Sequence, residues 1–171
     1  MIAENTLTEE KTKFKFGELC EDSKQRAINN ELENCWQDDW HQYLYDDAKS
    51  VGLKITGFDL DRNRHAEGEF TESEFDVANA ILKNHGDECE TFKTAVRFAA
   101  HVALMSKTDK FDDAGEKTES FAELCEQFLK DTLNNYARLL QDEADYRGSD
   151  EAITETILAN DFDFDADGNR I

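Results

Sequence analysis

The chain has 171 residues, of which 40 are Asp or Glu and 19 are Lys or Arg, so its formal charge at neutral pH is −21. Apolar residues make up 39% of it and include 12 Phe, 4 Tyr and 2 Trp, which is enough for a core and argues against disorder. The charge disfavours direct binding to DNA, RNA or an anionic membrane, and no apolar run approaches the roughly 20 residues of a membrane span.

The length suits one domain over residues 1–171, and no proline or Gly/Ser-rich linker marks a boundary. Residues 1–12 are polar, without the apolar stretch of a signal peptide, and are expected to be frayed. The absence of a leader predicts a cytoplasmic protein. The four cysteines form no CxxC pair, which is typical of small buried hydrophobes in a reduced compartment: Cys20, Cys35, Cys89 and Cys125.

The first predicted elements are a strand at residues 13–16 and a helix that begins after Asp22 or Ser23 as its N-cap. Between residues 27 and 51 apolar side chains recur at three- and four-residue steps. That spacing predicts one amphipathic helix, or two in series, that ends near Gly52.

A β-hairpin is predicted next. Residues 53–61 alternate as a strand whose phase slips at Gly57, as a β-bulge requires. Residues 62–64 form the turn, and residues 65–70 return as the partner strand. The strand at 13–16 is expected to join this hairpin as a third strand.

The remaining chain is mainly helical. Helices are predicted over 72–84 and 88–105, the second as a central core helix because it is the most apolar and least acidic part. A loop from 107 to 115 precedes a long helix from about 118 to 147. Ser149 caps a short helix to Asn160, and residues 161–171 form a strand and a turn. The expected class is α+β, a small antiparallel sheet of about three strands packed with four to six helices.

One group of acidic residues has helical spacing. Its members follow one another at steps of four, three, four and three, which places five carboxylates on one stripe away from the apolar face: Asp112, Glu116, Glu119, Glu123 and Glu126. Such a row offers fixed acceptors to Lys and Arg, as a phosphate backbone does. The alternative is an ordinary solvated helix face, and the two readings stay equally weighted.

Two further acidic groups suggest metal binding. Asp163, Asp165 and Asp167, followed by Gly168, match the first positions of a calcium loop, but the chain ends before the twelfth position, which favours a strand and hairpin turn. In the hairpin, the acids Asp59, Asp61, Glu67 and Glu69 could hold metals for phosphoryl transfer. Pairing with Arg62 and Arg64 on a solvated sheet face is the favoured alternative.

Other catalytic signals are weak. Among His41, His65, His85 and His101 the only ligand-like spacing is His85-x3-Cys89, with no second pair, so no zinc site is expected. No phosphate-binding loop or nucleophile motif is present. Trp36 and Trp40 lie one helical turn apart and are assigned to the core. We therefore expect no catalytic residue, no metal and no cofactor.

Several stretches resemble a widespread set of small acidic proteins of phages and prophages. They are Phe14-Lys-Phe-Gly-Glu-Leu19, residues 45–55 (YDDAKSVGLKI), residues 58–62 (FDLDR), residues 149–153 (SDEAI) and Asp167-Gly168. The resemblance covers most of the chain and transfers no site residues. It implies a viral or mobile-element origin, and members of such sets often inhibit host defences such as restriction or CRISPR systems, some by mimicking DNA.

The resulting hypothesis is a phage protein of the host cytoplasm, not an enzyme, that occupies the basic groove of a host nucleic-acid-binding defence protein. A homodimer is left open. A metal-dependent phosphoesterase at the hairpin and a regulator that binds through an apolar patch are the alternatives. Besides the stripe, further acids are expected to contact the partner: Asp142, Glu143, Asp145, Asp150, Glu151 and Glu155.

Overall fold

The computed structural model describes residues 12–36 and 39–171. Of the segment 1–12 that was expected to be frayed, only Thr12 belongs to the described part. The chain divides into two compact units. The terminal unit comprises Met1–Trp40 and Ala144–Ile171, and the central unit comprises His41–Glu143. Each has its own hydrophobic core. That residues 1–171 form one domain stays a prediction.

The α+β class is confirmed: the described residues form seven α-helices and two antiparallel sheets of two strands each. A strand forms near residues 13–16 as predicted, but it does not join the hairpin as a third strand. β1 (Phe14–Lys15) pairs with β4 (Asp163–Phe164), a partner 150 positions away that local patterning could not indicate. Two helices in series, α1 (Glu21–Leu32) and α2 (Gln42–Ser50), replace the single one that residues 27–51 also allowed.

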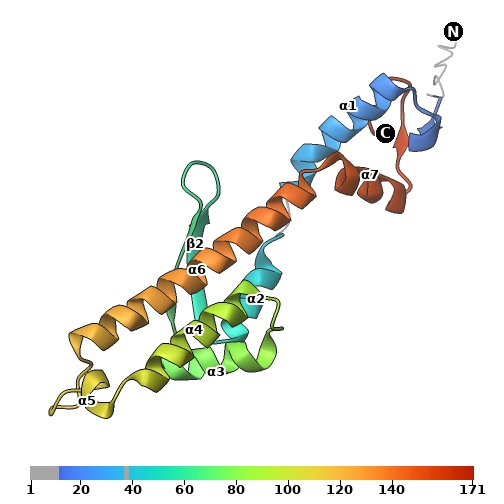
Figure 1. Cartoon of the computed structure of the whole chain (residues 1–171). Helices are drawn as coiled ribbons and strands as arrows, with labels where there is room; N and C mark the ends of the chain where they lie inside the picture. Colours follow the sequence, from blue (N-terminus) through green and yellow to red (C-terminus); the bar gives the residue numbers. More distant parts are fainter. Residues whose placement is uncertain (1–11, 37–38) are drawn as a thin grey trace, which may run out of the picture. The chain divides into compact units, whose positions relative to one another are not determined.

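The hairpin of the central unit consists of β2 (Leu53–Asp59) and β3 (His65–Phe70) (Figure 1). Its register confirms the predicted bulge, because Ile55 pairs with Gly68 and Gly57 pairs with Glu67, which leaves one extra residue on β2. A side chain at Gly68 would collide with the carbonyl oxygen of Lys54, so glycine is required at this point of the strand pairing.

Three helices follow the hairpin before the long one. α3 (Glu74–Asn84) begins at Ser73, whose hydroxyl accepts a hydrogen bond from the Asp76 N–H, and α4 (Glu90–Leu104) ends before Met105. The segment predicted as a loop contains the four-residue helix α5 (Lys107–Lys110). Ser106 and Asp109 form a reciprocal capping box around its start.

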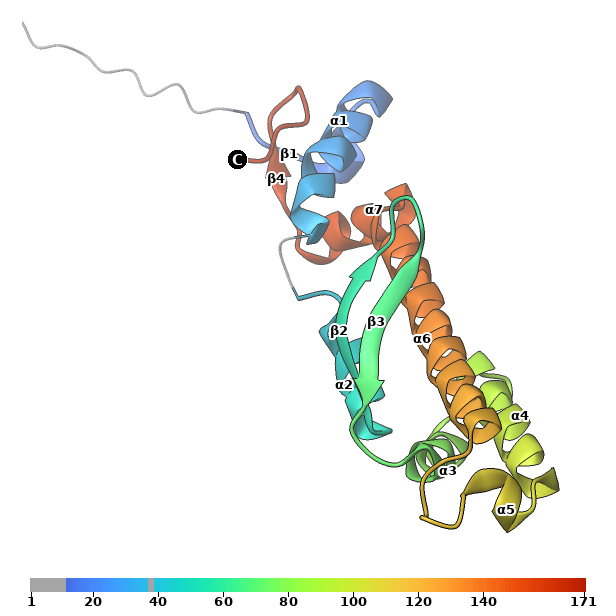
Figure 2. The ribbon, with the colours of Figure 1, turned by 90° about the vertical axis from the view of Figure 1, so that its left-hand side faces the viewer.

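The long helix α6 (Glu119–Arg147) confirms its predicted bounds within one residue, and its first 25 residues belong to the central unit. β3 lies on the α6 side of the hairpin and β2 on the α2 side (Figure 2). The core between these elements is a run of phenylalanine rings. Phe128 stacks on Phe98 with centroids 4.3 Å apart and tilts against Phe70 at 5.2 Å.

The prediction that α4 is a central core helix is half wrong. Thr91, Thr94, Ala95 and Phe98 are buried, but the opposite face is not covered by any described residue. Leu104 is 86% exposed and Val96 is 44% exposed. The apolar content of α4 therefore reflects two faces, only one of which packs on the core.

The terminal unit packs α1 against α7 (Asp150–Ala159), with the β1–β4 pair beside them (Figure 1). Ser149 caps α7 as predicted, since its hydroxyl accepts from the Ala152 N–H at 3.2 Å. The core comprises Phe16, Leu19, Ala27, Ile28, Ile153, Ile157 and Phe164.

The start of α1 differs from the prediction. Cys20 is its N-cap, and Ser23 is buried within the first turn. The Ser23 hydroxyl donates to the carbonyl oxygen of Ala166 at 2.8 Å, so it fastens the C-terminal turn onto α1. A tertiary partner has taken the hydroxyl that the sequence pattern assigned to a cap.

Trp36, at the end of the 3₁₀ turn η2 (Glu33–Trp36), does not occupy the core as expected. It is 43% exposed and meets Trp40 edge to face, with centroids 5.9 Å apart. The reason is that α1 ends at Leu32, so the two rings do not continue its buried face.

Candidate functional site

The acidic row on α6 consists of Glu119, Glu123 and Glu126. All three are exposed, because the buried face of the helix carries Phe121 and Cys125 on the other side. None of the three forms an ion pair with a Lys, Arg or His of the described residues. Neighbours in the row lie about 5–6 Å apart and repel each other weakly. These carboxylates are therefore available to an external cation.

The other two members of the predicted stripe, Asp112 and Glu116, are not on the helix. α6 begins only at Glu119, and the Asp112 carboxylate closes a turn by accepting from the N–H groups of Ala114 and Glu116, both at 2.9 Å. Gly115 adopts the left-handed conformation in that turn, with φ of +83°. The expected continuous stripe of five is wrong for this reason. Asp-Asp-Ala-Gly is a turn sequence, and this local preference outweighs the helical spacing of the acids.

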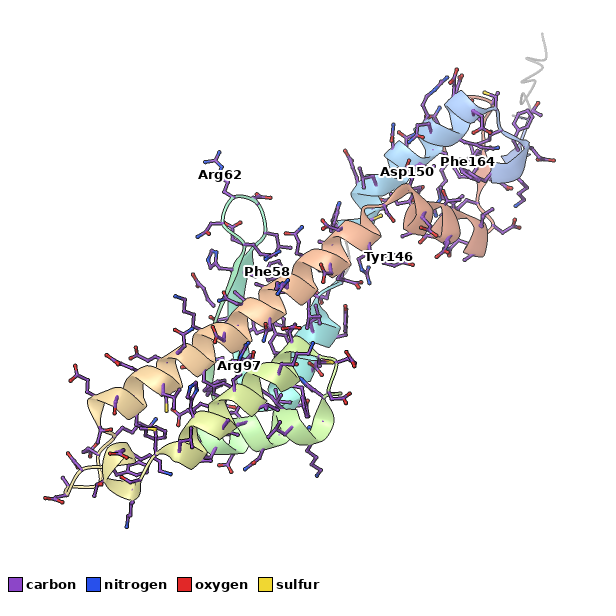
Figure 3. The ribbon with its side chains drawn as sticks, in the orientation of Figure 1. Phe58, Arg62, Arg97, Tyr146, Asp150 and Phe164 are labelled. Carbon is purple, nitrogen blue, oxygen red and sulfur yellow. The ribbon has the colours of Figure 1, made fainter. Side chains whose placement is uncertain are left out.

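The remaining acids expected to bind a partner lie in both units. Asp142 and Glu143 belong to the central unit, where Glu143 accepts from the Tyr43 hydroxyl at 2.9 Å. The others belong to the terminal unit: Asp145, Asp150, Glu151 and Glu155. Asp150, labelled in Figure 3, accepts from the Gln25 amide, and Glu155 accepts from the Tyr146 hydroxyl at 3.3 Å. That these acids share one binding surface stays a prediction.

The hairpin acids do not converge on one point, as a metal site would require, because three of them have different partners. Asp59 accepts from the backbone N–H of Asp61 at 2.8 Å and so shapes the turn. Glu69 lies 3.4 Å from Lys54, and Glu67 lies 3.6 Å from His65. Arg62, expected as a partner of these acids, projects from the tip of the hairpin (Figure 3). No group of three or more His, Cys, Asp or Glu is arranged to hold a metal ion within residues 12–36 and 39–171.

The three aspartates of the tail are also occupied. Asp163 contacts Lys13 and Lys15, Asp167 lies 3.4 Å from Arg26, and Asp165 accepts from backbone N–H groups of its own turn. The pKa of Asp163 is lowered, chiefly by its hydrogen bond with Lys15. The predicted strand and hairpin turn are confirmed, with Gly168 at φ +86°.

A pocket in the central unit was not predicted. It has a volume of about 440 Å³ and is formed by the end of α2, the turn between α3 and α4, the start of α4 and one face of α6. Its lining residues are Asp47, Asn84, His85, Gly86, Cys89, Glu90, Thr91, Asn135, Arg138, Leu139 and Asp142.

The polar groups of this pocket form a connected network around Asp47. The buried Tyr136 hydroxyl donates to Asp47 Oδ2 at 2.7 Å, and His85 Nε2 lies 3.6 Å from the same oxygen. The other ring nitrogen of His85, Nδ1, hydrogen-bonds Thr91 Oγ1 at 2.7 Å. His85 and then Tyr136 lower the pKa of Asp47, against the opposing effect of burial, so this carboxyl is held in its charged form.

His85 Nε2 is buried and has no hydrogen-bond partner among the described residues, since 3.6 Å is beyond hydrogen-bond distance. The side chain of His85 is 9% exposed. A buried polar atom without a hydrogen bond costs about 1–3 kcal/mol of folding free energy. Costs of that kind are commonly retained at functional sites.

The only sequence signal for this pocket was the His85-x3-Cys89 spacing, interpreted as an incomplete metal pair. His85 hydrogen-bonds Thr91 and lies 3.6 Å from Asp47, and Asp47 in turn accepts a hydrogen bond from Tyr136. Asp47 and Tyr136 are 89 positions apart, so only the packing of α2 against α6 brings them together.

The four cysteines differ in burial, and Cys35 is half-buried. Cys125 is buried as predicted, and burial raises the pKa of its thiol to about 11. Cys20 and Cys89 are exposed, contrary to the expectation, because both occupy N-cap positions of helices. The Ser23 hydroxyl lowers the pKa of Cys20.

Comparison with family models, curated proteins and solved structures gives no match. The described helices include none that is both long enough and apolar enough to cross a membrane.

Proposed function

We propose that the chain is an acidic, phage-encoded inhibitor that binds the basic surface of a host nucleic-acid-binding defence protein. The observation that carries this proposal is the row formed by Glu119, Glu123 and Glu126. Three exposed carboxylates, without a cationic partner among the described residues, project from one face of a helix whose other face is anchored in a core. A rigid row of this kind presents acceptors at fixed spacing to Lys and Arg side chains.

The size of the net negative charge also supports the proposal. Residues 41–143 carry a formal charge of −10 and the rest of the chain −11, which together make the total of −21. A field of this size attracts a basic surface over about one Debye length and accelerates encounter with it. Lys15 and Arg26 are paired with tail acids, and no cation of the described part pairs with the α6 row.

The test compares two triple charge reversals in a pull-down from nuclease-treated bacterial lysate. One variant carries Glu119→Lys, Glu123→Lys and Glu126→Lys; the matched control carries Asp46→Lys, Asp61→Lys and Asp87→Lys, three exposed acids of the same unit. We expect wild type and control to capture a protein that duplex DNA displaces, and that about 0.5 M salt releases. The α6 variant should bind at least about tenfold more weakly.

Retention of the partner by the α6 variant with loss in the control would move the binding surface to other acids. Equal capture by all three chains, insensitive to salt and to DNA, would refute charge-based binding. Circular dichroism of both variants establishes that the helices persist, as expected for exposed substitutions.

An apolar interaction surface is the second candidate, and one observation favours it. The outer face of α4 exposes Val96, Ala100, Ala103 and Leu104, the last at 86%. These positions recur at helical spacing and form a continuous apolar stripe. A partner that binds there would be retained in high salt and lost in a Val96→Ser, Leu104→Ser variant, which separates this candidate from the first.

A further inference from the structure

The pocket around Asp47 has an acidic interior. Asp47, Glu90 and Asp142 line it, against Arg138 and the imidazole of His85. Glu90 is partly neutralised, since Lys93 Nζ lies 2.9 Å from its Oε1. Asp142 and Arg138 form no ion pair within the described chain. The three carboxylates therefore outnumber the guanidinium of Arg138 and the ammonium of Lys93 by one negative charge.

The carboxylate of Asp47 is fixed in place for binding. Its Oδ2 accepts from Tyr136, whose side chain is fully buried, and that bond sets the orientation of the carboxyl plane. Asp47 remains 43% exposed, so part of the carboxylate faces the pocket. A carboxylate held by its neighbours loses little conformational entropy when a cation binds.

The lining also limits the kind of cation. The described residues offer no group of His, Cys, Asp or Glu that could hold a metal ion, while the pocket presents Leu139 and the Thr91 side chain beside the carboxylates. Apolar walls with an acidic end suit a cation that carries carbon, such as an alkylammonium or a guanidinium, which are less strongly hydrated than metal ions. The amide oxygens of Asn84 and Asn135 add neutral acceptors.

We infer that this pocket binds an organic cation, an ammonium or guanidinium group, with Asp47 as its principal counter-ion and Asp142 as a second one at the rim. The volume of about 440 Å³ accommodates the group and its alkyl chain. The cation can belong to a free amine or to an Arg or Lys side chain of a bound protein. The site is independent of the acidic row on α6.

Titration calorimetry and NMR of the full chain test this inference with defined probes. Agmatine represents a free organic cation, and N-acetyl-arginine amide represents an arginine side chain in a protein. N-acetyl-citrulline amide has nearly the same shape without the charge, and inorganic phosphate probes the opposite sign. We expect at least one cationic probe to shift the amide signals of His85, Thr91 and Asn135, and neither the citrulline probe nor phosphate to do so.

The variants assign the binding to Asp47. Asp47→Asn removes the charge but keeps an oxygen that accepts from Tyr136, and it should weaken binding of the cation by about ten- to a hundredfold. Asp142→Asn should weaken it less. Asp46→Asn, on the same helix with its carboxylate bonded to Gln42, is the matched control and should leave binding unchanged.

Each outcome decides the inference. Binding of agmatine alone assigns a free amine, and binding of the arginine derivative alone assigns a protein side chain. Equal binding of the citrulline derivative, preferential binding of phosphate, full affinity in Asp47→Asn, or no binding of either cation would overturn the inference. Because the α6 charge-reversal variant retains this pocket, it should still bind the cation even where it fails to capture a partner.

Discussion

One acidic group of the terminal unit and one of the central unit use their carboxylates differently. In the terminal unit the acids of the C-terminal tail are paired with cations from the start of the chain: Asp161 and Asp163 with Lys15, and Asp167 with Arg26. In the central unit the row of Glu119, Glu123 and Glu126 on α6 has no such partner in the part of the chain that the structure describes. Carboxylates therefore have at least two roles in this chain: those of the tail join distant segments by ion pairs, and those of the α6 row form an exposed anionic helix face.

The hydrophobic cores of the two units also differ in how they are packed. The central unit relies on large stacked rings, with Phe98 and Phe128 at its centre. The terminal unit is small and depends on close backbone contacts, above all where Gly168 packs against the carbonyl of Ser23. A small unit of this kind buries less apolar surface, so local geometry contributes a larger share of its stability.

The largest expected effect concerns the central core. Phe128→Ala removes a ring that contacts both Phe98 and Phe70, and it should lower the free energy of unfolding by about 3–5 kcal/mol. Hydrogen exchange should show faster exchange in α3 and α4, while α1 and α7 keep their protection. Uniform loss of protection in all four helices would show that the two cores unfold as one and would break the comparison.

The next effect concerns the terminal unit. An alanine at Gly168 would bring its Cβ into collision with the Ser23 carbonyl oxygen, at a φ of +86°, so Gly168→Ala should cost on the order of 2–4 kcal/mol. Gly115→Ala is the matched control, since its φ is +83° but no atom lies within 4 Å of the added Cβ. It should cost about 1 kcal/mol. Equal costs in urea unfolding would show that the close contact contributes nothing beyond backbone strain.

Sequence patterns predicted the elements of both units well where the signal was local. The bounds of α6, the Ser149 cap and the bulge near Gly57 all depend on residues within one or two turns of each other, and all are confirmed. The β1–β4 pair escaped prediction because each strand has only two residues, too few for alternation to identify a partner.

The candidate sites were less predictable for a related reason. Spacing alone extended the acidic stripe to Asp112, although that carboxylate is used inside a turn. The pocket around Asp47 is lined by residues of α2, α4 and α6, which lie too far apart in the sequence to show a common spacing. Helical periodicity identifies which face of a helix is polar, but it does not say which polar residues from separate elements converge.

The third expected effect tests the pocket network through pH. Asp47 has a lowered pKa in the folded chain, so its contribution to stability is present above the ordinary carboxyl pKa and is lost as the pH falls towards the lowered value. Tyr136→Phe removes one of the bonds that lower this pKa, so the pKa of Asp47 should rise towards its ordinary value. The variant should lose about 1 kcal/mol near neutral pH and less in acid. NMR titration of the Asp47 carboxyl checks it, and an unchanged pKa would contradict the assigned hydrogen bond.

The smallest expected effect is the change in the free energy of unfolding when one acid of each unit is neutralised. It distinguishes the two acidic groups most clearly, because the sign of the change should differ between them. Glu123→Gln removes repulsion from Glu119 and Glu126 at helical spacing and should raise the free energy of unfolding by a few tenths of a kcal/mol. Asp163→Asn removes the contacts with Lys13 and Lys15 and should lower it. Chemical denaturation at low ionic strength, repeated in high salt, should show both changes shrink as screening increases. If both substitutions destabilised the chain, the α6 row would be part of the structural charge network, and its carboxylates would no longer be distinguished from those that hold the tail in place.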